Sequence, residues 1–180
     1  MKRGLIVVMI VGCVVGAWKA VRQRGQGAPS FATAEEFIAF ASQNAVTDAE
    51  TYEHTKLDYS VDSLKQVDQI LGHVHDAYVK NPSSVRLRGI STEYGAYIGE
   101  VIRRSRPNVY WTRDSEVMGK KSYALHWKTG ESYPFTWCAE RITDGDGDSI
   151  WVKYSVIDDP SWEQRSSAAA ARSKKLAAKK

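Results

Sequence analysis

The chain has 180 residues, 43% of them hydrophobic and 11% aromatic, which is enough to bury the core of one domain without a disulfide framework or a structural metal. Residues 1–24 carry five basic side chains and no acidic one, and residues 161–180 carry six basic and one acidic, so residues 25–160 have a net charge of −6 although the whole chain has +4. Folded domains that bind nucleic acid gather basic residues on one face, and this acidic central region argues against nucleic acid as the main partner.

The N-terminal segment is predicted to lie in a membrane. Residues 4–18 form an uncharged, hydrophobic run behind Lys2 and Arg3, a pattern typical of a signal peptide or signal anchor. Extended to residue 21, with Lys19 reaching the headgroups, a helix would span about 27 Å of a hydrocarbon core that is roughly 30 Å thick. We expect residues 1–24 to be an uncleaved membrane helix.

The segment has two other possible fates. Val15-Gly16-Ala17 could be a signal-peptidase site, and Cys13 ends a sequence that resembles a lipobox, which would make Cys13 a lipidation site. The apolar run continues past Cys13, and basic residues follow Trp18 directly, so the uncleaved span is favoured. Because a very short N-terminus usually stays inside, we expect a single-pass protein of the bacterial inner membrane whose domain is periplasmic.

After a linker at residues 25–32, which contains two glycines and a proline, the domain is expected to extend over residues 33–160. Its first half predicts three helices, at residues 33–42, 60–78 and 87–102, because apolar side chains recur there at helical spacing. The first helix opens with a capping box of Thr33 and Glu36. The third contains Gly89, Gly95 and Gly99, which predict close approach by a neighbour, either the second helix or a sheet.

The second half is rich in Trp, Tyr and β-branched residues, which favour strands. Strands are predicted at residues 109–112, 123–127 and 150–157, and a short helix over 134–142, with a strand over 133–139 as its alternative. The predicted turns are residues 128–130 and 144–148. The expected fold class is therefore α+β, with two or three N-terminal helices packed on a small antiparallel sheet, and residues 161–180 are expected to be a basic disordered tail.

Four short stretches, LDYS, YGAYIGEVIRR, YPF and an Arg-Ile pair followed by Asp-Gly, lie within residues 57–157. Over this range the chain resembles an uncharacterised bacterial domain family. The matching residues are of packing and turn types. The resemblance implies domain boundaries and no activity.

Known catalytic and cofactor motifs are missing from the sequence, so we expect no cofactor and no metal site. Asp144-Gly-Asp-Gly-Asp148 resembles the start of a calcium loop, but the twelfth position is Ser155 instead of a bidentate Glu, so a solvated turn is expected. The lone Cys138, between Trp137 and Ala139, is expected to be a small buried residue and not a nucleophile.

A recognition surface is predicted on the third helix. Aromatic and Arg side chains dominate binding hot spots, and they occur together there with two acidic residues. The candidate binding residues are Glu93, Tyr94, Tyr97, Glu100 and Arg103. The alternative is that the tyrosines belong to the core and that Glu100 pairs with Arg104 one turn later.

The sequence favours a membrane-anchored bacterial envelope protein that binds another protein without catalysing a reaction, as an accessory or immunity-like factor would. The basic tail is a candidate contact for anionic lipid. An envelope hydrolase is the alternative, and it would require convergence of groups that lie far apart in sequence. These groups are Asp58, Ser60, Glu93, Glu100, Arg103 and His126.

Overall fold

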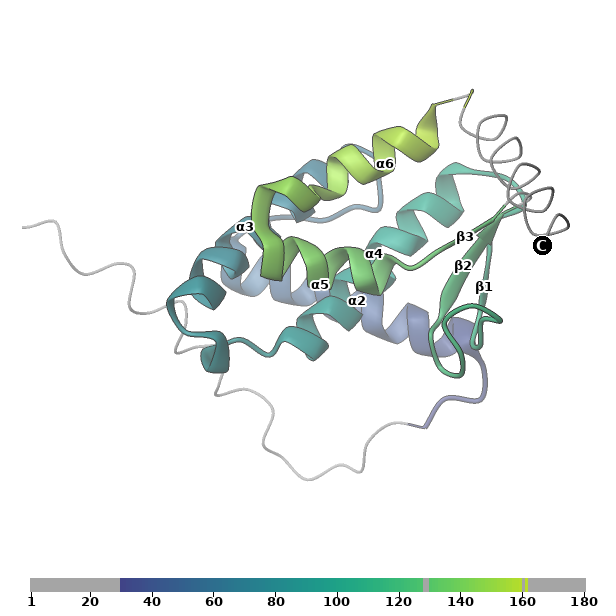
Figure 1. Ribbon diagram of the computed structural model, residues 1–180, viewed down its shortest axis with the longest axis horizontal. Coiled ribbons are helices and arrows are strands. Elements are labelled where there is room, and N and C mark those ends of the chain that lie inside the picture. Colours follow the sequence, from purple (N-terminus) through teal and green to yellow (C-terminus); the bar gives the residue numbers. More distant parts are fainter. Residues whose placement is uncertain (1–29, 128–129, 160, 162–180) are drawn as a thin grey trace, which may run out of the picture. The chain divides into compact units, whose positions relative to one another are not determined.

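A computed structural model describes residues 30–127, 130–159 and 161 (Figure 1). In these ranges the chain forms five α-helices and one three-stranded antiparallel sheet, so the predicted α+β class is confirmed. The helices are α2 (Ala34–Glu53), α3 (Ser63–Lys80), α4 (Leu87–Ser105), α5 (Pro134–Asp144) and α6 (Ile150–Asp158), with 3-10 turns η1 (Pro82–Ser84) and η2 (Gly145–Asp148). The strands are β1 (Tyr110–Thr112), β2 (Ala124–Trp127) and β3 (Gly130–Ser132).

The described residues do not include the predicted membrane span with Cys13, residues 25–29 of the linker or residues 162–180 of the tail. Within the part of the chain that is described, no helix is both long and apolar enough to cross a membrane.

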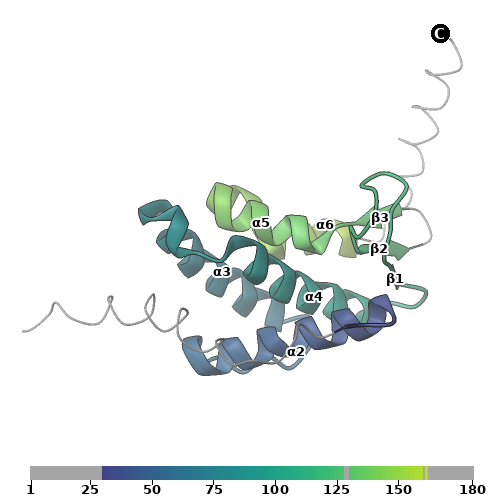
Figure 2. The same cartoon turned by 90° about the horizontal axis from the view of Figure 1, so that it is seen from below.

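Helix α4 is the centre of the domain. It lies between α2 on one side and α5 on the other, and α3 packs against both α5 and α6 (Figures 1 and 2). Every side chain from Glu93 to Ile102 of α4 is buried. A helix that is covered on most sides needs apolar side chains on most sides, and this accounts for the apolar and aromatic residues that α4 carries around its circumference.

Helix α2 is longer than the sequence predicts, because it continues past Ser42 to Glu53. The predicted capping contact is present: the Glu36 amide donates to Thr33 Oγ1 over 3.1 Å. Beyond Ser42 the buried face of the helix consists of Ala45 and Ala49. Alanines at helical spacing contribute little hydrophobic contrast, and for this reason the periodic signal faded while the helix continued.

The glycines of α4 allow two aromatic rings to approach its backbone. A Cβ atom on Gly95 would lie 2.4 Å from Phe135 Cδ1 of α5, and one on Gly99 would lie 2.0 Å from Trp111 Cζ2 of β1. The predicted close neighbour is thus confirmed for the sheet at Gly99. At Gly95 the neighbour is α5 and not the second predicted helix, α3.

The sheet has the strand order β1-β2-β3. In the register, Trp111 lies opposite Leu125, and both side chains are buried against the helices. Tyr110 lies opposite His126, which lies opposite Glu131, so these three residues form a row on the other face, away from the core. Strand β3 was not predicted, because the sequence there indicated only a turn ending at Gly130.

The prediction of a strand at residues 150–157 is wrong, because this segment is helix α6. Its β-branched and aromatic residues resemble a strand, but the buried ones, Ile150, Tyr154 and Ile157, recur at helical spacing. Asp68 of α3 starts the helix: its carboxylate accepts hydrogen bonds from the Ile150 amide (2.9 Å) and the Ser149 hydroxyl (2.6 Å). Tertiary contacts have therefore overridden local propensity.

The Asp144–Asp148 segment ends α5 and forms η2. Its carboxylates pair with side chains of the domain, Asp146 with Arg141 at 2.9 Å and Asp148 with Lys153 at 2.8 Å. Gly145 follows α5, as predicted, with φ of 81°. This backbone conformation strongly favours glycine, and a Cβ there would also lie 2.9 Å from His75 Nε2.

Candidate functional site

The residues predicted as a recognition surface are mostly inside the domain. Tyr94 and Tyr97 are fully buried, and Glu93 and Glu100 are only 5% and 6% exposed to solvent. The Arg103 side chain is 41% exposed. A partner that docks on this conformation of the domain can reach Arg103 but not the tyrosine rings.

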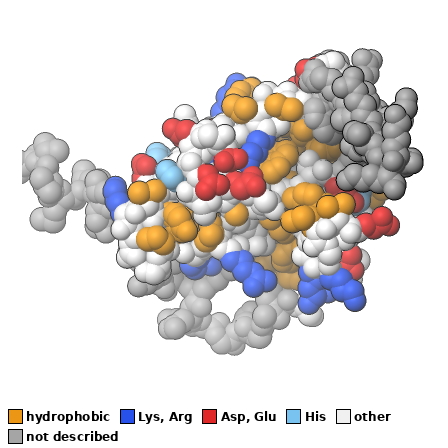
Figure 3. All heavy atoms as spheres, viewed as in Figure 1, with side chains coloured by type: hydrophobic (Ala, Val, Ile, Leu, Met, Phe, Trp, Pro, Cys, Tyr) orange, Lys and Arg blue, Asp and Glu red, His pale blue; other side chains and the backbone are white. Residues whose placement is uncertain are grey.

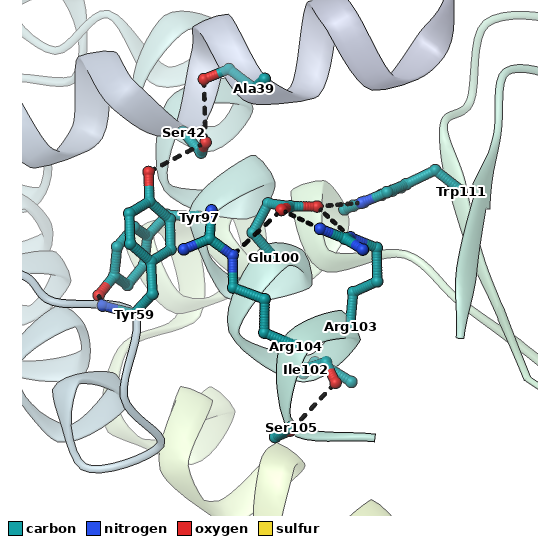
Figure 4. A network of polar contacts seen from close by, with 10 residues as sticks. All are labelled: Ala39, Ser42, Tyr59, Tyr97, Glu100, Ile102, Arg103, Arg104, Ser105 and Trp111. Carbon is teal, nitrogen blue, oxygen red and sulfur yellow. Dashed lines mark hydrogen bonds and ion pairs between the residues drawn. The ribbon is translucent and has the colours of Figure 1, made fainter. Parts of the chain in front are cut away.

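Glu100 is the hub of a polar network that joins α4 to the sheet (Figure 4). Its carboxylate accepts hydrogen bonds from Arg103 Nε (2.7 Å), from Arg103 Nη2 (2.9 Å) and from the Trp111 indole (3.1 Å). Arg104 Nε lies 3.4 Å away, as the predicted pair one turn apart requires. Burial alone would raise the pKa of Glu100, but the bonds from Arg103 and Trp111 outweigh it and hold the pKa below its ordinary value.

Tyr97, one turn before Glu100 on the same face of α4, is held by a second network. The Ser63 hydroxyl donates to the Ser60 carbonyl, so the 2.6 Å contact with Tyr97 must be a bond that the Tyr97 hydroxyl donates. The Tyr97 oxygen in turn accepts the Tyr59 amide at 2.8 Å. The Tyr59 ring stacks on the Tyr97 ring, with 4.7 Å between the two ring centroids (Figure 4). The Arg104 guanidinium lies over the Tyr59 ring, 3.7 Å from its centroid.

These two networks fix the position of the loop before α3 and of strand β1 relative to α4. Tyr59 has φ of 62°, a left-handed conformation uncommon for an aromatic residue, and the Tyr97 hydroxyl satisfies its amide there. Glu93 pairs with Arg86 at 3.7 Å. Burial raises the pKa of the Tyr94 hydroxyl, which keeps it un-ionised. The α4 cluster is best explained as a structural support.

The outward face of the sheet has a different character. Tyr110 is 56% exposed, and its ring stacks almost parallel on His126, with 5.3 Å between centroids. The Thr112 hydroxyl donates to the Asp114 carbonyl, so its 2.7 Å contact with His126 is a bond donated by the imidazole Nε2–H. Glu131 Oε1 lies 3.7 Å from the same nitrogen. His126 is therefore oriented from two sides and presents a fixed platform to Tyr110.

Glu131 also connects this face to the loop between β1 and β2. Its carboxylate accepts hydrogen bonds from the Tyr133 hydroxyl and, at 2.6 Å, from the Ser115 hydroxyl. These bonds, from Ser115 first and Tyr133 second, lower the pKa of Glu131. The Ser115 oxygen accepts the amides of Val117 (3.0 Å) and Met118 (3.1 Å). The loop is thus fastened to the sheet by a continuous set of hydrogen bonds.

His126 does not converge with the other groups that a hydrolase would need. His126 lies on the outward face of the sheet, whereas Glu100 contacts Trp111, whose side chain projects from the inward face. Asp58 and Ser60 contact each other within their own loop, where the Ser60 amide donates to Asp58 Oδ1 at 2.9 Å. Helix α3 begins at Ser63 with Asp62 as its N-cap, three residues later than predicted, but Ser60 Oγ accepts the Ser63 amide.

Two further predictions concern the lone cysteine of the domain and possible metal sites. Cys138 is fully buried and free, as predicted, and burial raises the pKa of its thiol. Across residues 30–127 and 130–159, no group of three or more His, Cys, Asp or Glu side chains is placed so that it could hold a metal ion.

Comparisons with protein-family models, with curated proteins and with solved structures find no match to this chain. The resemblance over residues 57–157 stays a prediction, and function must be argued from the geometry.

Sequence reasoning did not select the outward face of the sheet. The sequence suggested His126 only as a hydrolase group or a metal ligand, and it placed Tyr110 in a strand without a role. The signal that could have found this face is the alternation within β1, where Tyr110 and Thr112 flank the buried Trp111. Which of the two faces is exposed, however, depends on what packs against the sheet.

Proposed function

We propose that this protein is a membrane-anchored, non-enzymatic protein-binding module whose contact surface is the outward face of the sheet, with Tyr110 as its central residue. The observation that carries the proposal is that Tyr110 is an exposed aromatic side chain stacked on an oriented histidine. Tyr is enriched among the residues that dominate binding energy, and a ring that is already fixed loses little conformational freedom on association.

The surroundings of Tyr110 suit a protein partner. His126, Thr112 and Glu131 provide polar groups around an aromatic centre, the arrangement found in protein interfaces, in which an apolar core is surrounded by a polar rim. The hydrophobic run at residues 4–18 supports the proposed anchor, and the domain would then act at the bacterial envelope, on the periplasmic side.

The proposal is tested with the full-length chain, affinity-tagged in the bacterium that encodes it, cross-linked in cells and purified in mild detergent. Three versions are compared: the wild type, Tyr110→Ala, and the control Val79→Ala. Val79 is 64% exposed near the end of α3, at the other end of the domain from the sheet (Figures 1 and 2). Loss of a hot-spot residue costs about 2 kcal/mol or more, so Tyr110→Ala should weaken partner binding about 30-fold, whereas Val79→Ala should not.

Recovery of one protein by the wild type and the Val79 variant, with loss in the Tyr110 variant, would support the proposal. Equal recovery by all three versions would exclude Tyr110 as the contact. Recovery of nothing beyond the tag control would contradict the binding role itself.

A further inference from the structure

The loop between β1 and β2, residues 113–123, projects from the end of the domain at which α2 begins (Figure 1). The two are in contact, because the rings of Phe37 and Tyr123 lie 4.6 Å apart. Phe31 extends this aromatic group, at 5.5 Å from Phe37 and 5.2 Å from Phe40, which is 42% exposed. Apolar surface therefore continues from the loop to the point where the chain arrives from its N-terminal segment.

The tip of the loop exposes two apolar side chains, Val117 at 77% and Met118 at 54%. The turn that carries them is fixed: Ser115 and Gly119 exchange backbone hydrogen bonds of 3.0 and 2.9 Å, and the Ser115 hydroxyl binds the amides in between. Because the loop is held in this way, its apolar side chains cannot fold back onto the domain and remain in water. Single exposed apolar residues are common on protein surfaces, but here two adjacent ones adjoin the aromatic group at the start of α2, and a contiguous apolar surface of this kind marks a contact.

Basic side chains adjoin this tip. Lys120 and Lys121 follow it directly and are exposed, and the Lys121 amide is bound by Asp114 Oδ1 at 2.8 Å, which holds the pair at the loop. Figure 3 shows Lys and Arg side chains beside hydrophobic ones at the lower right, where the sheet and this loop end. Apolar residues next to lysines match a lipid interface, where the lysines meet phosphate groups and the apolar residues meet acyl chains.

The length of chain before α2 limits how far this end can lie from a membrane. If residues 1–24 are the proposed anchor, seven residues lead from residue 24 to Phe31. Fully extended they span at most about 25 Å. The end of the domain that carries Phe31 and the loop would therefore stay close to the bilayer, at a distance that the loop can bridge.

We infer that the tip of this loop, Val117 and Met118 with Lys120 and Lys121, is a second membrane contact of the domain, and that its ligand is the phospholipid interface. This inference rests on the anchoring in the proposed function. It orients the domain so that the loop faces the bilayer and the outward face of the sheet remains accessible to a protein partner.

The test uses the full-length chain in phosphatidylcholine vesicles with or without phosphatidylglycerol, in a Cys13→Ser background in which the buried Cys138 stays unlabelled. A polarity-sensitive fluorophore is placed by Val117→Cys or, as the control, by Val79→Cys. We expect a lipid-borne quencher to reduce fluorescence at position 117 and to leave position 79 unchanged. Lys120→Glu with Lys121→Glu should abolish the additional quenching that phosphatidylglycerol causes.

Failures of the two proposals are distinguishable. If the protein does not float with the vesicles after an alkaline wash, the anchor is wrong. If it floats and position 117 is not quenched by lipid, the anchor stands and the loop contact is wrong. Shielding of position 117 that requires added cell proteins, without lipid quenching, would likewise overturn it and would assign the loop to a protein interface.

Discussion

Two regions of this domain contain the same kinds of residue in opposite environments. The α4 cluster combines Tyr97 and Glu100 with arginines, and the outward face of the sheet combines Tyr110 and Glu131 with a histidine. In the first, the Tyr and Glu side chains are buried and bonded to neighbouring elements. In the second, the tyrosine is more than half exposed.

The difference shows that residue type does not separate a supporting cluster from a binding surface. A central helix contacts neighbours on most of its circumference, so its polar side chains must find partners inside the domain. A sheet covered on one side leaves alternate residues in water. Mutations in the two regions should therefore affect different properties: stability in the α4 cluster, and binding at the sheet.

The largest expected effect on stability is that of Gly95→Ala in α4. The new Cβ would lie 2.4 Å from Phe135 Cδ1 and 2.7 Å from Phe135 Cα, and a backbone atom cannot move aside easily. Overpacking should cost about 3 kcal/mol, and the higher helix propensity of Ala should return about 1 kcal/mol. We therefore expect the free energy of unfolding to fall by about 2 kcal/mol. Urea unfolding followed by circular dichroism measures this free energy.

Gly89→Ala is the matched control, because it lies on the same helix. The closest contact of its Cβ would be the Arg86 guanidinium, at 2.9 Å, which is the far end of a flexible side chain. This variant should be as stable as the wild type or more stable by up to about 1 kcal/mol. Equal losses of stability in both variants would show that the contact between Gly95 and Phe135 does not cause the destabilisation.

The second prediction concerns Glu100→Gln and its dependence on pH. The amide can still accept the Trp111 bond but loses the charge-assisted bonds to Arg103, so about 1.5 kcal/mol should be lost at pH 7. The folded-state pKa of Glu100 lies below the ordinary 4.5, so its carboxylate stabilises the fold above about pH 4.5. That contribution disappears as the pH falls through the folded-state pKa, and the two proteins should then converge in stability.

Glu131→Gln provides the comparison at the sheet. The pKa of Glu131 is lowered as well, so the pH dependence has the same sign, but its side chain is 20% exposed and solvent weakens its interactions. We expect a smaller loss than at Glu100. Unfolding at pH 7 and pH 4 measures both, and a larger loss at Glu131 would contradict the division between a supporting core and an exposed face.

Only a small loss of stability is expected for Tyr110→Ala. Removal of the ring forfeits its stacking on His126, worth about 0.5–1 kcal/mol, and leaves no cavity because the ring is at the surface. Tyr97→Phe, which only removes a hydroxyl, should cost about 1–2 kcal/mol because it leaves the Tyr59 amide without its acceptor. Thermal unfolding of both variants is the measurement, and the reverse order would refute the assignment of the two tyrosines.

The sequence by itself determined the elements whose signal is local. The capping box at Thr33, the periodic run of α4, the strand at Tyr110–Thr112 and the helix before Gly145 were all predicted, since caps, spacing and glycine conformation act within a few residues. The end of α2 was missed because its later buried residues are alanines, which resemble exposed ones in composition.

Tertiary structure decided the rest. Residues 150–158 form a helix whose first turn is capped locally by Ser149 and also by Asp68, more than eighty positions earlier, which binds the first amide of α6; no local pattern reports the contact with Asp68. Glu93, Tyr94, Tyr97 and Glu100 of α4 are buried because α2, α5 and Trp111 of the sheet pack on that helix, whereas Tyr110 lies on the opposite face of β1 from the buried Trp111 and is more than half exposed. Periodicity states which side chains share a face, but only the packing of neighbouring elements determines whether that face meets protein or water.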